Sequence, residues 1–401
     1  MDIFICEFVS GGGLASEDVS SSLFSEAFAM LRVLASGFAA SGDQVVTLLD
    51  ERIAPIKEIL PATTAFTINS KADFFRKLKE QAANTDLVVC VAPETDGCLY
   101  HCSQLLEKAA PGRLIGCSKE FVELAGDKWQ TAQHLDSMKL PTPKTHLTTF
   151  GEADAYLREN PGSYVVKPRD GVSGEGLVLV STPNDLENAL QHFSYLRDEK
   201  FLLQEFIEGR HGSLSFVCGE TPMPVSANRQ IIDINEKGFF EYSGGEIPWD
   251  HPQIPAVLEK GLKFLENSPG SKGWIGIDFV LNSSNHWLIE CNPRVTSSIV
   301  GAWTLDSQAI GANLKASLNF EDYRSLPSGY TIFKKMACKG TETWDETQLL
   351  AEMPGIVSPP FAFQDFASAF LTAKGKTRKE AQQRILQIES NFKESTHHGA
   401  I

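Results

Sequence analysis

The sequence predicts an α/β protein in which a parallel sheet at the N-terminus precedes a larger unit of mixed strands and helices. Over residues 1–120, apolar strand-like runs alternate with amphipathic segments of helical period. Farther along, pairs of strand-like runs are joined by short polar or glycine-rich turns. Strand–helix alternation is typical of a parallel sheet that helices cover on both faces. A chain of 401 residues is long enough for two or three domains.

An N-terminal α/β domain is predicted over residues 1–120. Apolar residues such as Leu23, Phe24, Ala27 and Phe28 recur at helical spacing and predict its first helix. The predicted strands are 3–8, 45–49, 87–92 and 113–116, and the predicted helices are 22–40, 70–83 and 101–110.

A loop of three glycines leaves the first predicted strand. Ligands of parallel sheets bind beyond the carboxyl ends of the strands. Gly11, Gly12 and Gly13, together with Glu17 just after them, are therefore candidate substrate-binding residues. Helix capping explains Glu17 and Asp18 equally well, because acidic side chains stabilise helix N-termini.

Two neighbouring strands carry the side chains that a hard cation prefers. The strand WIGIDFVL carries Asp278, and the strand WLIECN carries Glu290 and Asn292. Glu290 and Asn292 are two residues apart, so their side chains share one face of the strand. Mg²⁺ prefers a few oxygen ligands, completed by water and substrate phosphates. Arg294, just past the second strand, suits bidentate phosphate binding.

A second group of residues suits phosphate binding. The apolar run SYVVK delivers Lys167 into a glycine-rich loop whose backbone N–H groups can approach phosphate oxygens. The candidate loop residues are Gly171, Ser173, Gly174 and Gly176. Lys128, at a predicted helix start, is a second phosphate candidate, although a single lysine in such a place is ordinarily solvated.

The run FLLQEFIEG suits an adenine pocket. It is an apolar strand that turns polar at its end, where its backbone can read the purine edge. Its carboxylates can meet the exocyclic amine or the ribose hydroxyls. The candidate residues are Gln204, Glu205, Phe206, Ile207 and Glu208. An ordinary strand exit explains the same pattern.

Taken together, these elements resemble the ATP-grasp superfamily of carboxylate–amine ligases over roughly residues 120–320. The resemblance implies an ATP-grasp fold behind an N-terminal pre-ATP-grasp domain, an ADP-forming reaction, and ATP and Mg²⁺ as cofactors, with Mn²⁺ as a substitute. It assigns Lys128, Lys167 and loop 170–176 to the phosphates, residues 204–208 to adenine and ribose, and Asp278, Glu290 and Asn292 to the metal. Many members carry a ribose-binding glutamate where this chain has His211, so either Glu208 or His211 takes that role.

Three shorter segments narrow the resemblance. EFVSGGGL, YSGGEIP and NPRVTSS are similar to segments of the ligases that join glutamate to tyramine in methanofuran synthesis, and of their bacterial counterparts in methylofuran synthesis. The resemblance implies small-molecule substrates, glutamate and an aromatic amine, joined through an acyl phosphate. Arg294 and Lys167 would stabilise the transferred phosphoryl group. Arg229, on a predicted strand, is a candidate to orient the acceptor carboxylate or the acyl phosphate, and Glu246, beside a glycine pair, is a candidate to hold the amine. The three segments are expected to meet in one pocket.

Other interpretations stay open. Arg229 also fits a surface strand, and a plain hairpin turn explains the glycines beside Glu246. The chain could be an ATP-grasp ligase for a dipeptide or a carboxylase-type substrate, or a nucleotide-binding subunit without turnover. The complete metal triad argues against a subunit without turnover.

The ligase elements are predicted to occupy residues 121–325, in two subdomains divided near residue 208. Residues 326–401 are predicted to form a small α/β closing unit. It should contain strands near 329–337 and 367–373 and a helix over 375–392. Thr377 and Glu380, three residues apart, fit a capping box at the start of that helix.

Composition excludes some kinds of partner. The formal net charge is −15 and no basic block offsets it, which argues against nucleic acid. We expect no apolar run of transmembrane length, no secretory leader and no membrane partner. The eight cysteines form no disulfide pattern, and several lie in apolar strands, which favours a cytoplasmic protein. A homo-oligomer stays open.

Overall fold

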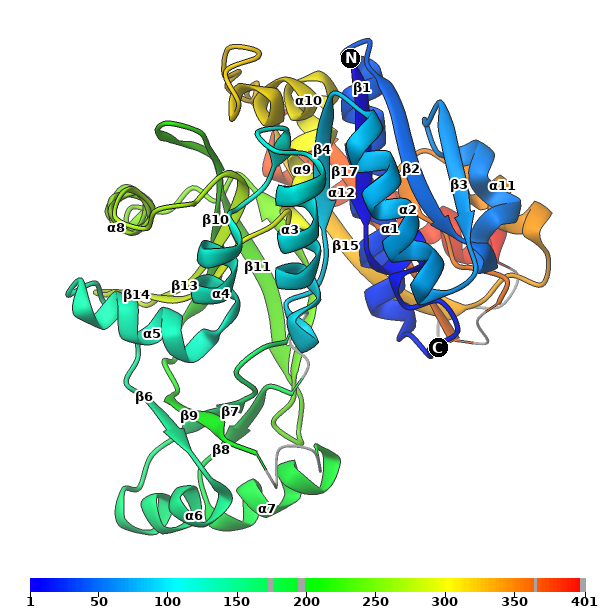
Figure 1. Cartoon of the computed structure of the whole chain (residues 1–401). Helices are drawn as coiled ribbons and strands as arrows, with labels where there is room; N and C mark the ends of the chain where they lie inside the picture. Colours follow the sequence, from blue (N-terminus) through cyan, green and yellow to red (C-terminus); the bar gives the residue numbers. More distant parts are fainter. Residues whose placement is uncertain (172–175, 194–198, 364–365, 397–401) are drawn as a thin grey trace.

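The computed structural model describes residues 1–171, 176–193, 199–363 and 366–396 (Figure 1). The described strands form three sheets of five, four and eight strands. Two candidate loop residues, Ser173 and Gly174, lie outside the described part of the chain.

The first sheet is wholly parallel, with the strand order β3-β2-β1-β4-β5. Its strands are β1 (Asp2–Glu7), β2 (Gln44–Asp50), β3 (Thr64–Ile68), β4 (Leu87–Val91) and β5 (Leu114–Ile115). The four predicted strands are confirmed, and β3 is an additional edge strand. The chain order reverses between β1 and β4, which is the place where ligands of such sheets bind.

Helices cover this sheet. α1 (Ser21–Ala40) packs between β1 and C-terminal elements, whereas α2 (Lys71–Asn84) and α3 (Cys98–Ala109) pack against each other. The expectation that no segment reaches transmembrane length is wrong, because α1 is long and apolar enough. However, 72% of that apolar stretch is buried inside the protein, so we interpret α1 as a core helix. The shorter elements of this region are η1 (Val9–Gly13), η2 (Glu51–Ile59), η3 (Thr95–Gly97), α4 (Lys119–Gly126) and α5 (Lys128–Ser137).

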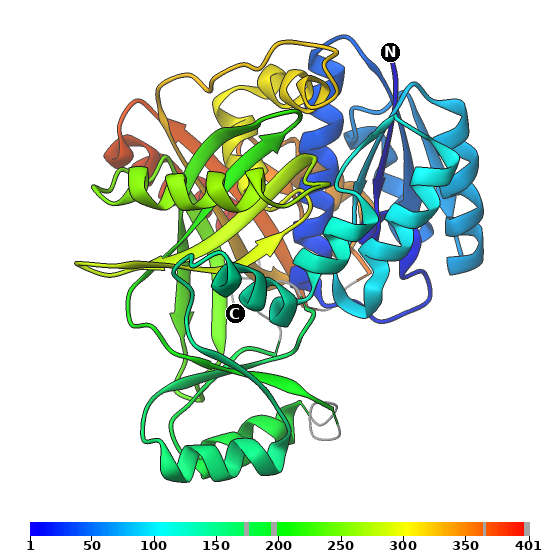
Figure 2. The same cartoon turned by 60° about the vertical axis from the view of Figure 1, so that its left-hand side comes forward.

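The second sheet is antiparallel and forms a lobe that projects from the rest of the molecule (Figures 1 and 2). It has the order β6-β9-β7-β8, and two helices complete its own apolar core. These elements are β6 (Thr145–Thr148), α6 (Phe150–Glu159), β7 (Tyr164–Lys167), β8 (Val178–Val180), α7 (Pro183–His192) and β9 (Phe201–Glu205).

The third sheet has the order β14-β13-β10-β11-β12-β15-β17-β16. Its strands are β10 (Arg210–Cys218), β11 (Pro222–Ile234), β12 (Phe240–Ile247), β13 (Gly273–Leu281), β14 (His286–Asn292), β15 (Tyr330–Lys339), β16 (Ile356–Ser358) and β17 (Phe366–Gly375). The accompanying helices are α8 (Ile254–Glu266), α9 (Ser298–Leu305), α10 (Ser307–Ala316), α11 (Trp344–Glu352) and α12 (Arg378–Ser395).

The C-terminal segment extends this large sheet. β15 pairs with β12, and β17 pairs with β15, so both predicted C-terminal strands are confirmed as continuations of this large sheet. The predicted helix is α12, and the Thr377 hydroxyl caps it by accepting the N–H of Glu380 at 3.2 Å. The Glu380 carboxylate accepts the N–H of Lys376 at 2.8 Å. The division of the chain into three domains stays a prediction.

Candidate active site

A cavity lies among the large sheet, the small lobe and the N-terminal helix α1. Side chains from β7, β9, β10 to β14, α1 and α5 line it. Most of the predicted site residues line this cavity. Those that do are Lys128, Lys167, Gly171, Gln204, Glu205, Phe206, Ile207, His211, Arg229, Asp278, Glu290, Asn292 and Arg294.

The three predicted metal ligands meet on one strand pair. Asp278 of β13 lies opposite Glu290 of β14 in the antiparallel register. The Asp278 carboxylate accepts hydrogen bonds from Asn292 Nδ2 at 3.2 Å and from Gln230 Nε2 at 3.1 Å. The Glu290 carboxylate lies 3.6 Å from Lys128 Nζ. One β-hairpin register therefore brings together side chains that are 12 to 14 residues apart in the sequence.

The electrostatics of this pair fit a divalent cation. Burial and the neighbouring Glu290 raise the pKa of Asp278 to about 8. Burial acts in the same direction on Glu290, but the charges of Lys128 and Lys167 outweigh it and lower the pKa of Glu290. Two adjacent buried carboxylates repel each other when both are charged, and a divalent cation between them removes that repulsion. Two carboxylates and an amide also form a donor set that Mg²⁺ accepts.

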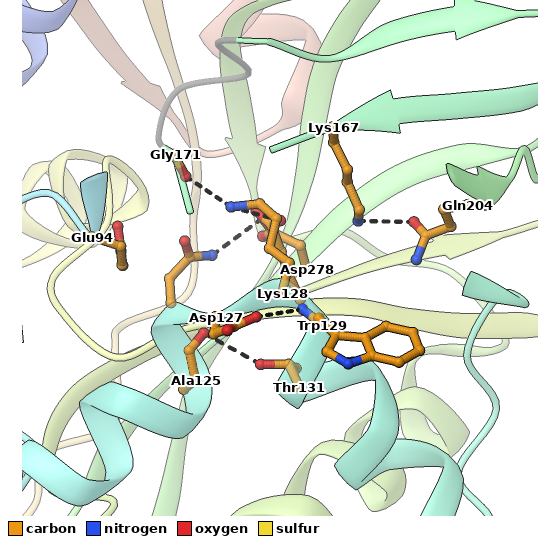
Figure 3. A network of polar contacts seen from close by, with 12 residues as sticks. Glu94, Ala125, Asp127, Lys128, Trp129, Thr131, Lys167, Gly171, Gln204 and Asp278 are labelled. Carbon is orange, nitrogen blue, oxygen red and sulfur yellow. Dashed lines mark hydrogen bonds and ion pairs between the residues drawn. The ribbon is translucent and has the colours of Figure 1, made fainter. Parts of the chain in front are cut away.

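Two lysines reach toward these carboxylates from different elements (Figure 3). Lys128 is only 7% exposed, so its interpretation as a solvated lysine is wrong. Its Nζ donates a hydrogen bond to the Gly171 carbonyl at 2.8 Å. Lys167, at the end of β7, donates to Gln204 Oε1 at 2.9 Å. Burial lowers the pKa of Lys167 to about 8.

Local sequence explains why α5 begins at Lys128. The Asp127 carboxylate caps the helix by accepting the N–H of Trp129 at 2.9 Å, and it pairs with Arg169. The Lys128 N–H in turn donates to the Arg169 carbonyl at 2.8 Å. The start of α5 is thus tied to the segment that enters the glycine-rich loop. Of the described loop glycines, Gly171 lines the cavity and Gly176 does not.

The adenine segment lies partly on the cavity wall. Gln204 is buried, and its Nε2 donates to Thr145 Oγ1 at 2.7 Å while its Oε1 accepts from Lys167. Glu205, Phe206 and Ile207 also line the cavity. Glu208 is exposed and does not line the cavity, whereas His211 of β10 does. Burial lowers the pKa of His211, which favours a neutral ring.

Arg294 connects the large sheet to the N-terminal sheet. Its Nε donates to both carboxylate oxygens of Glu94, at 2.9 and 3.0 Å, and both side chains are buried. Glu94 follows β4, and Glu7 ends β1, so both acids lie at the carboxyl edge where the strand order reverses. Burial raises the pKa of Glu7 to about 6, although hydrogen bonds from Ser10 and Val9 and the charge of Arg294 oppose the shift. Through Glu94, this edge of the N-terminal sheet therefore holds Arg294, which lines the cavity.

Glu246 lies in a groove beside the cavity rather than in it. It accepts hydrogen bonds from Arg229 Nη1 at 3.2 Å and from Arg378 Nε and Nη2 at 2.7 and 2.9 Å. Two guanidinium groups occupy this carboxylate, so the predicted amine-binding role does not fit. The hairpin interpretation is also wrong, because Gly244 lies inside β12, where an added Cβ would be 2.1 Å from the Phe333 carbonyl oxygen.

The three N-terminal glycines pack inside their own domain. Added Cβ atoms at Gly12 and Gly13 would lie 2.7 Å from neighbouring side chains, and Gly11 is buried. Glu17 is exposed and pairs with Lys71 at 3.4 Å. None of these four predicted substrate residues lines the cavity. The expected convergence of the three segments is therefore wrong for EFVSGGGL, while NPRVTSS reaches the cavity and YSGGEIP contributes only its tyrosine.

Sequence reasoning missed four residues at this site, which are Glu26, Glu94, Gln230 and Tyr242. A usable signal existed for Glu94, because it follows a strand of the parallel sheet at the edge where ligands bind. Gln230 follows Arg229 on a predicted strand, so its position next to a candidate site residue was a weak signal in the sequence. Glu26 lies on a helix whose apolar period predicts only core packing, so its sequence context carries no such signal.

Comparisons with known proteins agree with this architecture. Residues 125–298 match the family model of the ATP-grasp domain, and residues 44–122 match that of the pre ATP-grasp 3 domain. The chain is 32% identical over 245 residues to the tyramine–L-glutamate ligase of Methanocaldococcus jannaschii, covering 60% of this chain and 67% of the relative. The enzyme of the same name from Methanocaldococcus fervens is 30% identical over 269 residues, covering 67% of this chain and 79% of the relative.

Solved structures with the same fold cover nearly the whole chain. The biotin carboxylase domain of the Hydrogenobacter thermophilus 2-oxoglutarate carboxylase superposes with a TM-score of 0.70 at 14% identity, covering 97% of this chain and 89% of that chain. The ADP complex of the Staphylococcus aureus N5-carboxyaminoimidazole synthetase gives a TM-score of 0.68 at 14% identity, covering 96% of each chain. At these identities the likeness concerns the fold.

Proposed function

The chain belongs to the ATP-grasp family of carboxylate–amine ligases, and we propose that it joins glutamate to tyramine or a tyrosine-like amine. One observation carries the catalytic part of this proposal. Paired carboxylates, two buried lysines and Arg294 surround one cavity, which is the set of charges that ATP-driven phosphoryl transfer needs. The identity to two tyramine–L-glutamate ligases supports the choice of substrates.

Each group in the cavity takes one role. Lys128 and Lys167 bind phosphate oxygens, and the strand end after Gln204 binds adenine. Asp278, Glu290 and Asn292 would hold Mg²⁺, which neutralises phosphate charge when bound. His211 takes the ribose, because it lines the cavity and Glu208 does not.

The reaction proceeds in two displacements. A glutamate carboxylate oxygen attacks the γ-phosphorus of ATP, ADP leaves, and an acyl phosphate forms. The neutral amine then attacks the acyl carbon, phosphate departs with the C–O electron pair, and the nitrogen loses a proton to give the amide. Arg294 stabilises the transferred phosphoryl group, and Arg229, which lines the cavity, orients the acceptor carboxylate. The protein contributes position and charge rather than a covalent nucleophile.

Isotope tracing and substrate competition test this proposal. Glutamate labelled with ¹⁸O in its carboxylates should transfer one label per turnover to inorganic phosphate when tyramine is present. Label appearing in AMP instead would overturn the acyl-phosphate route. ADP release should be greatest with glutamate plus tyramine among a panel of amino acids and amines.

A dipeptide ligase is the second candidate. It is favoured by 26% identity over 212 residues to the D-alanine–D-alanine ligase of Idiomarina loihiensis, covering 49% of this chain and 65% of the relative. Faster ADP release with D-alanine alone than with glutamate plus tyramine would establish this alternative. The ligase chemistry would survive that result, while the choice of substrates would not.

We also propose a cytoplasmic role in the synthesis of a methanofuran- or methylofuran-type cofactor. The support is the name of the two relatives, whose product, an amide of tyramine, would serve as a building block. A host strain that lacks this chain should lose the furan cofactor, and the added amide of glutamate and tyramine should restore it. Retention of the cofactor in that strain would contradict the proposed role.

A further inference from the structure

Part of the cavity wall comes from outside the ligase unit. Glu26 of α1 lines the cavity together with Tyr242 of β12, Ser297 after β14, and Phe333 of β15. Glu26 is 7% exposed, and most of the other buried residues of α1 are apolar. Buried carboxylates are rare unless they are paired or serve a ligand. An ion pair with Lys335 accounts for the burial of this acid, and its place on the cavity wall lets it contact a ligand.

Lys335 holds the Glu26 side chain in a defined position. Its Nζ lies 3.1 Å from Glu26 Oε2 and 3.0 Å from Ser22 Oγ, one helical turn before Glu26. The same ammonium group lies 5.2 Å from the ring centroid of Tyr242. Lys335 does not line the cavity, whereas Glu26 does. Glu26 therefore faces the cavity, while Lys335 fixes its position from outside the cavity.

The surrounding wall offers both signs of charge and an apolar surface. Arg294 lines the same cavity, and Glu26 is one of the carboxylates whose charge raises the Arg294 pKa against the opposing effect of burial. Arg294 uses Nε for Glu94 and Nη1 for the Val295 carbonyl, and its Nη2 has no hydrogen bond within the described chain. A carboxylate and a guanidinium on one wall match the two charges of an amino acid.

We propose that Glu26 binds the α-ammonium group of the amino-acid substrate and thereby selects an amino acid over a simple dicarboxylate. The inference rests on the proposed function, because it assumes that glutamate is the acceptor. The attacking amine is a poorer partner for Glu26. A carboxylate stabilises the ammonium form, which has no lone pair and cannot attack an acyl phosphate, whereas the α-ammonium group does not react.

Comparison of glutamate with glutarate isolates this contact, because glutarate has both carboxylates and no ammonium group. The wild-type kcat/KM with tyramine should be about 30-fold or more higher for glutamate than for glutarate, the loss typical of removing one member of a buried charge pair. Glu26→Gln should remove most of that preference by raising the KM for glutamate. Its kcat/KM for glutarate and its KM for ATP should stay near the wild-type values.

Two variants separate recognition from folding. Glu26→Asp keeps the charge and should retain part of the preference, and Lys335→Met should weaken it because Glu26 loses its positioning partner. Equal losses for glutamate and glutarate in Glu26→Gln would show a structural role and overturn the proposal. A raised KM for tyramine with an unchanged glutamate preference would also overturn it. No amide from glutamate and tyramine in the wild type would instead overturn the proposed function, and this inference with it.

Discussion

At the scale of single residues, two buried carboxylates of opposite behaviour define the site. Asp278 and Glu290 lie opposite each other, yet the pKa of Asp278 is raised and that of Glu290 is lowered. Burial acts to raise both pKa values, and the charge of Glu290 raises that of Asp278 further. The charges of Lys128 and Lys167, together with a hydrogen bond with Asp278, lower the pKa of Glu290. This asymmetry keeps one permanent negative charge between the two lysines. A cation that binds here would meet one charged carboxylate and displace a proton from the other.

Removing the charge of Glu290 should abolish most turnover. Glu290→Gln preserves the shape of the side chain but removes a charged metal ligand, which should cost several kcal/mol of transition-state stabilisation. ADP release at saturating Mg²⁺ measures the loss, and thermal unfolding checks that the fold is intact. Glu266→Gln, at an exposed position at the end of α8, is the matched control and should keep wild-type activity. Near wild-type turnover in Glu290→Gln would show that the metal assignment is wrong.

The lowered pKa of Lys167 predicts a pH dependence of nucleotide binding. The free side chain loses its proton as the pH rises through about 8, and only the protonated form attracts phosphate. ATP affinity, measured by calorimetry in EDTA so that metal ligands do not contribute, should fall by up to about tenfold per unit above that pH. Lys167→Arg keeps its charge throughout and should show a flatter profile. If ATP affinity fell equally with pH in the wild type and in Lys167→Arg, deprotonation of Lys167 would not be its cause.

At the scale of secondary structure, the close packing of strand β10 against two aromatic rings fixes the position of one part of the cavity wall. Gly212 of β10 lies opposite Phe279 of β13 and against the stacked rings of Phe279 and Trp249, whose planes differ by 11°. An added Cβ at Gly212 would lie 2.3 Å from Trp249 and 2.7 Å from Phe279. This glycine is required by space rather than by backbone conformation. Its neighbour His211 is thereby held on the cavity wall.

Replacement of this glycine should therefore destabilise the protein. Gly212→Ala should lower the free energy of unfolding by about 1–3 kcal/mol, because the rings must move to admit a methyl group. Gly151→Ala is the control, since no atom lies within 4 Å of an added Cβ in the exposed helix α6, and it should be neutral or slightly stabilising. Urea unfolding of both variants measures the difference. Equal free energies of unfolding in the two variants would show that the rings of Trp249 and Phe279 move aside without loss of stability.

At the scale of the whole molecule, two ion pairs connect the N-terminal region to the large sheet beside the active-site cavity. The Arg294–Glu94 ion pair spans 200 residues of sequence, and both side chains are about nine-tenths buried. Glu26 and Lys335 form a second such link over 309 residues. The N-terminal domain therefore positions residues of the cavity in addition to packing against it.

Breaking the first link should be costly because it leaves a buried charge without its partner. Glu94→Ala should lower the free energy of unfolding by about 3–5 kcal/mol and reduce turnover by misplacing Arg294. Glu80→Ala removes an exposed partner of Arg76 and should cost less than about 1 kcal/mol. Unfolding and ADP release measured on both variants test the contrast. Equal effects would mean that the Arg294–Glu94 pair contributes no more than a surface pair.

The sequence by itself determined the features that depend on neighbouring residues. Helical and strand periods predicted α1, β2, β4 and the C-terminal strands, and the alternate positions of Glu290 and Asn292 predicted a shared face. The order of lysine, glycine-rich loop and acidic strand pair indicated the ATP-grasp family before any contact was known. These features follow from local geometry, which a short stretch of sequence is enough to specify.

Only the tertiary structure decided which distant side chains share the cavity. Glu246 looked available in its glycine-rich segment, but Arg378, 132 residues away, occupies its carboxylate. The N-terminal glycines looked like a ligand loop, but the side chains of their own domain fill the space around them. Glu26 had no role predicted from the sequence, but the packing of α1 places it on the cavity wall. The period of apolar residues specifies which face of a helix or strand a side chain occupies. Which other element packs against that face depends on the tertiary fold, and no short stretch of sequence contains that information.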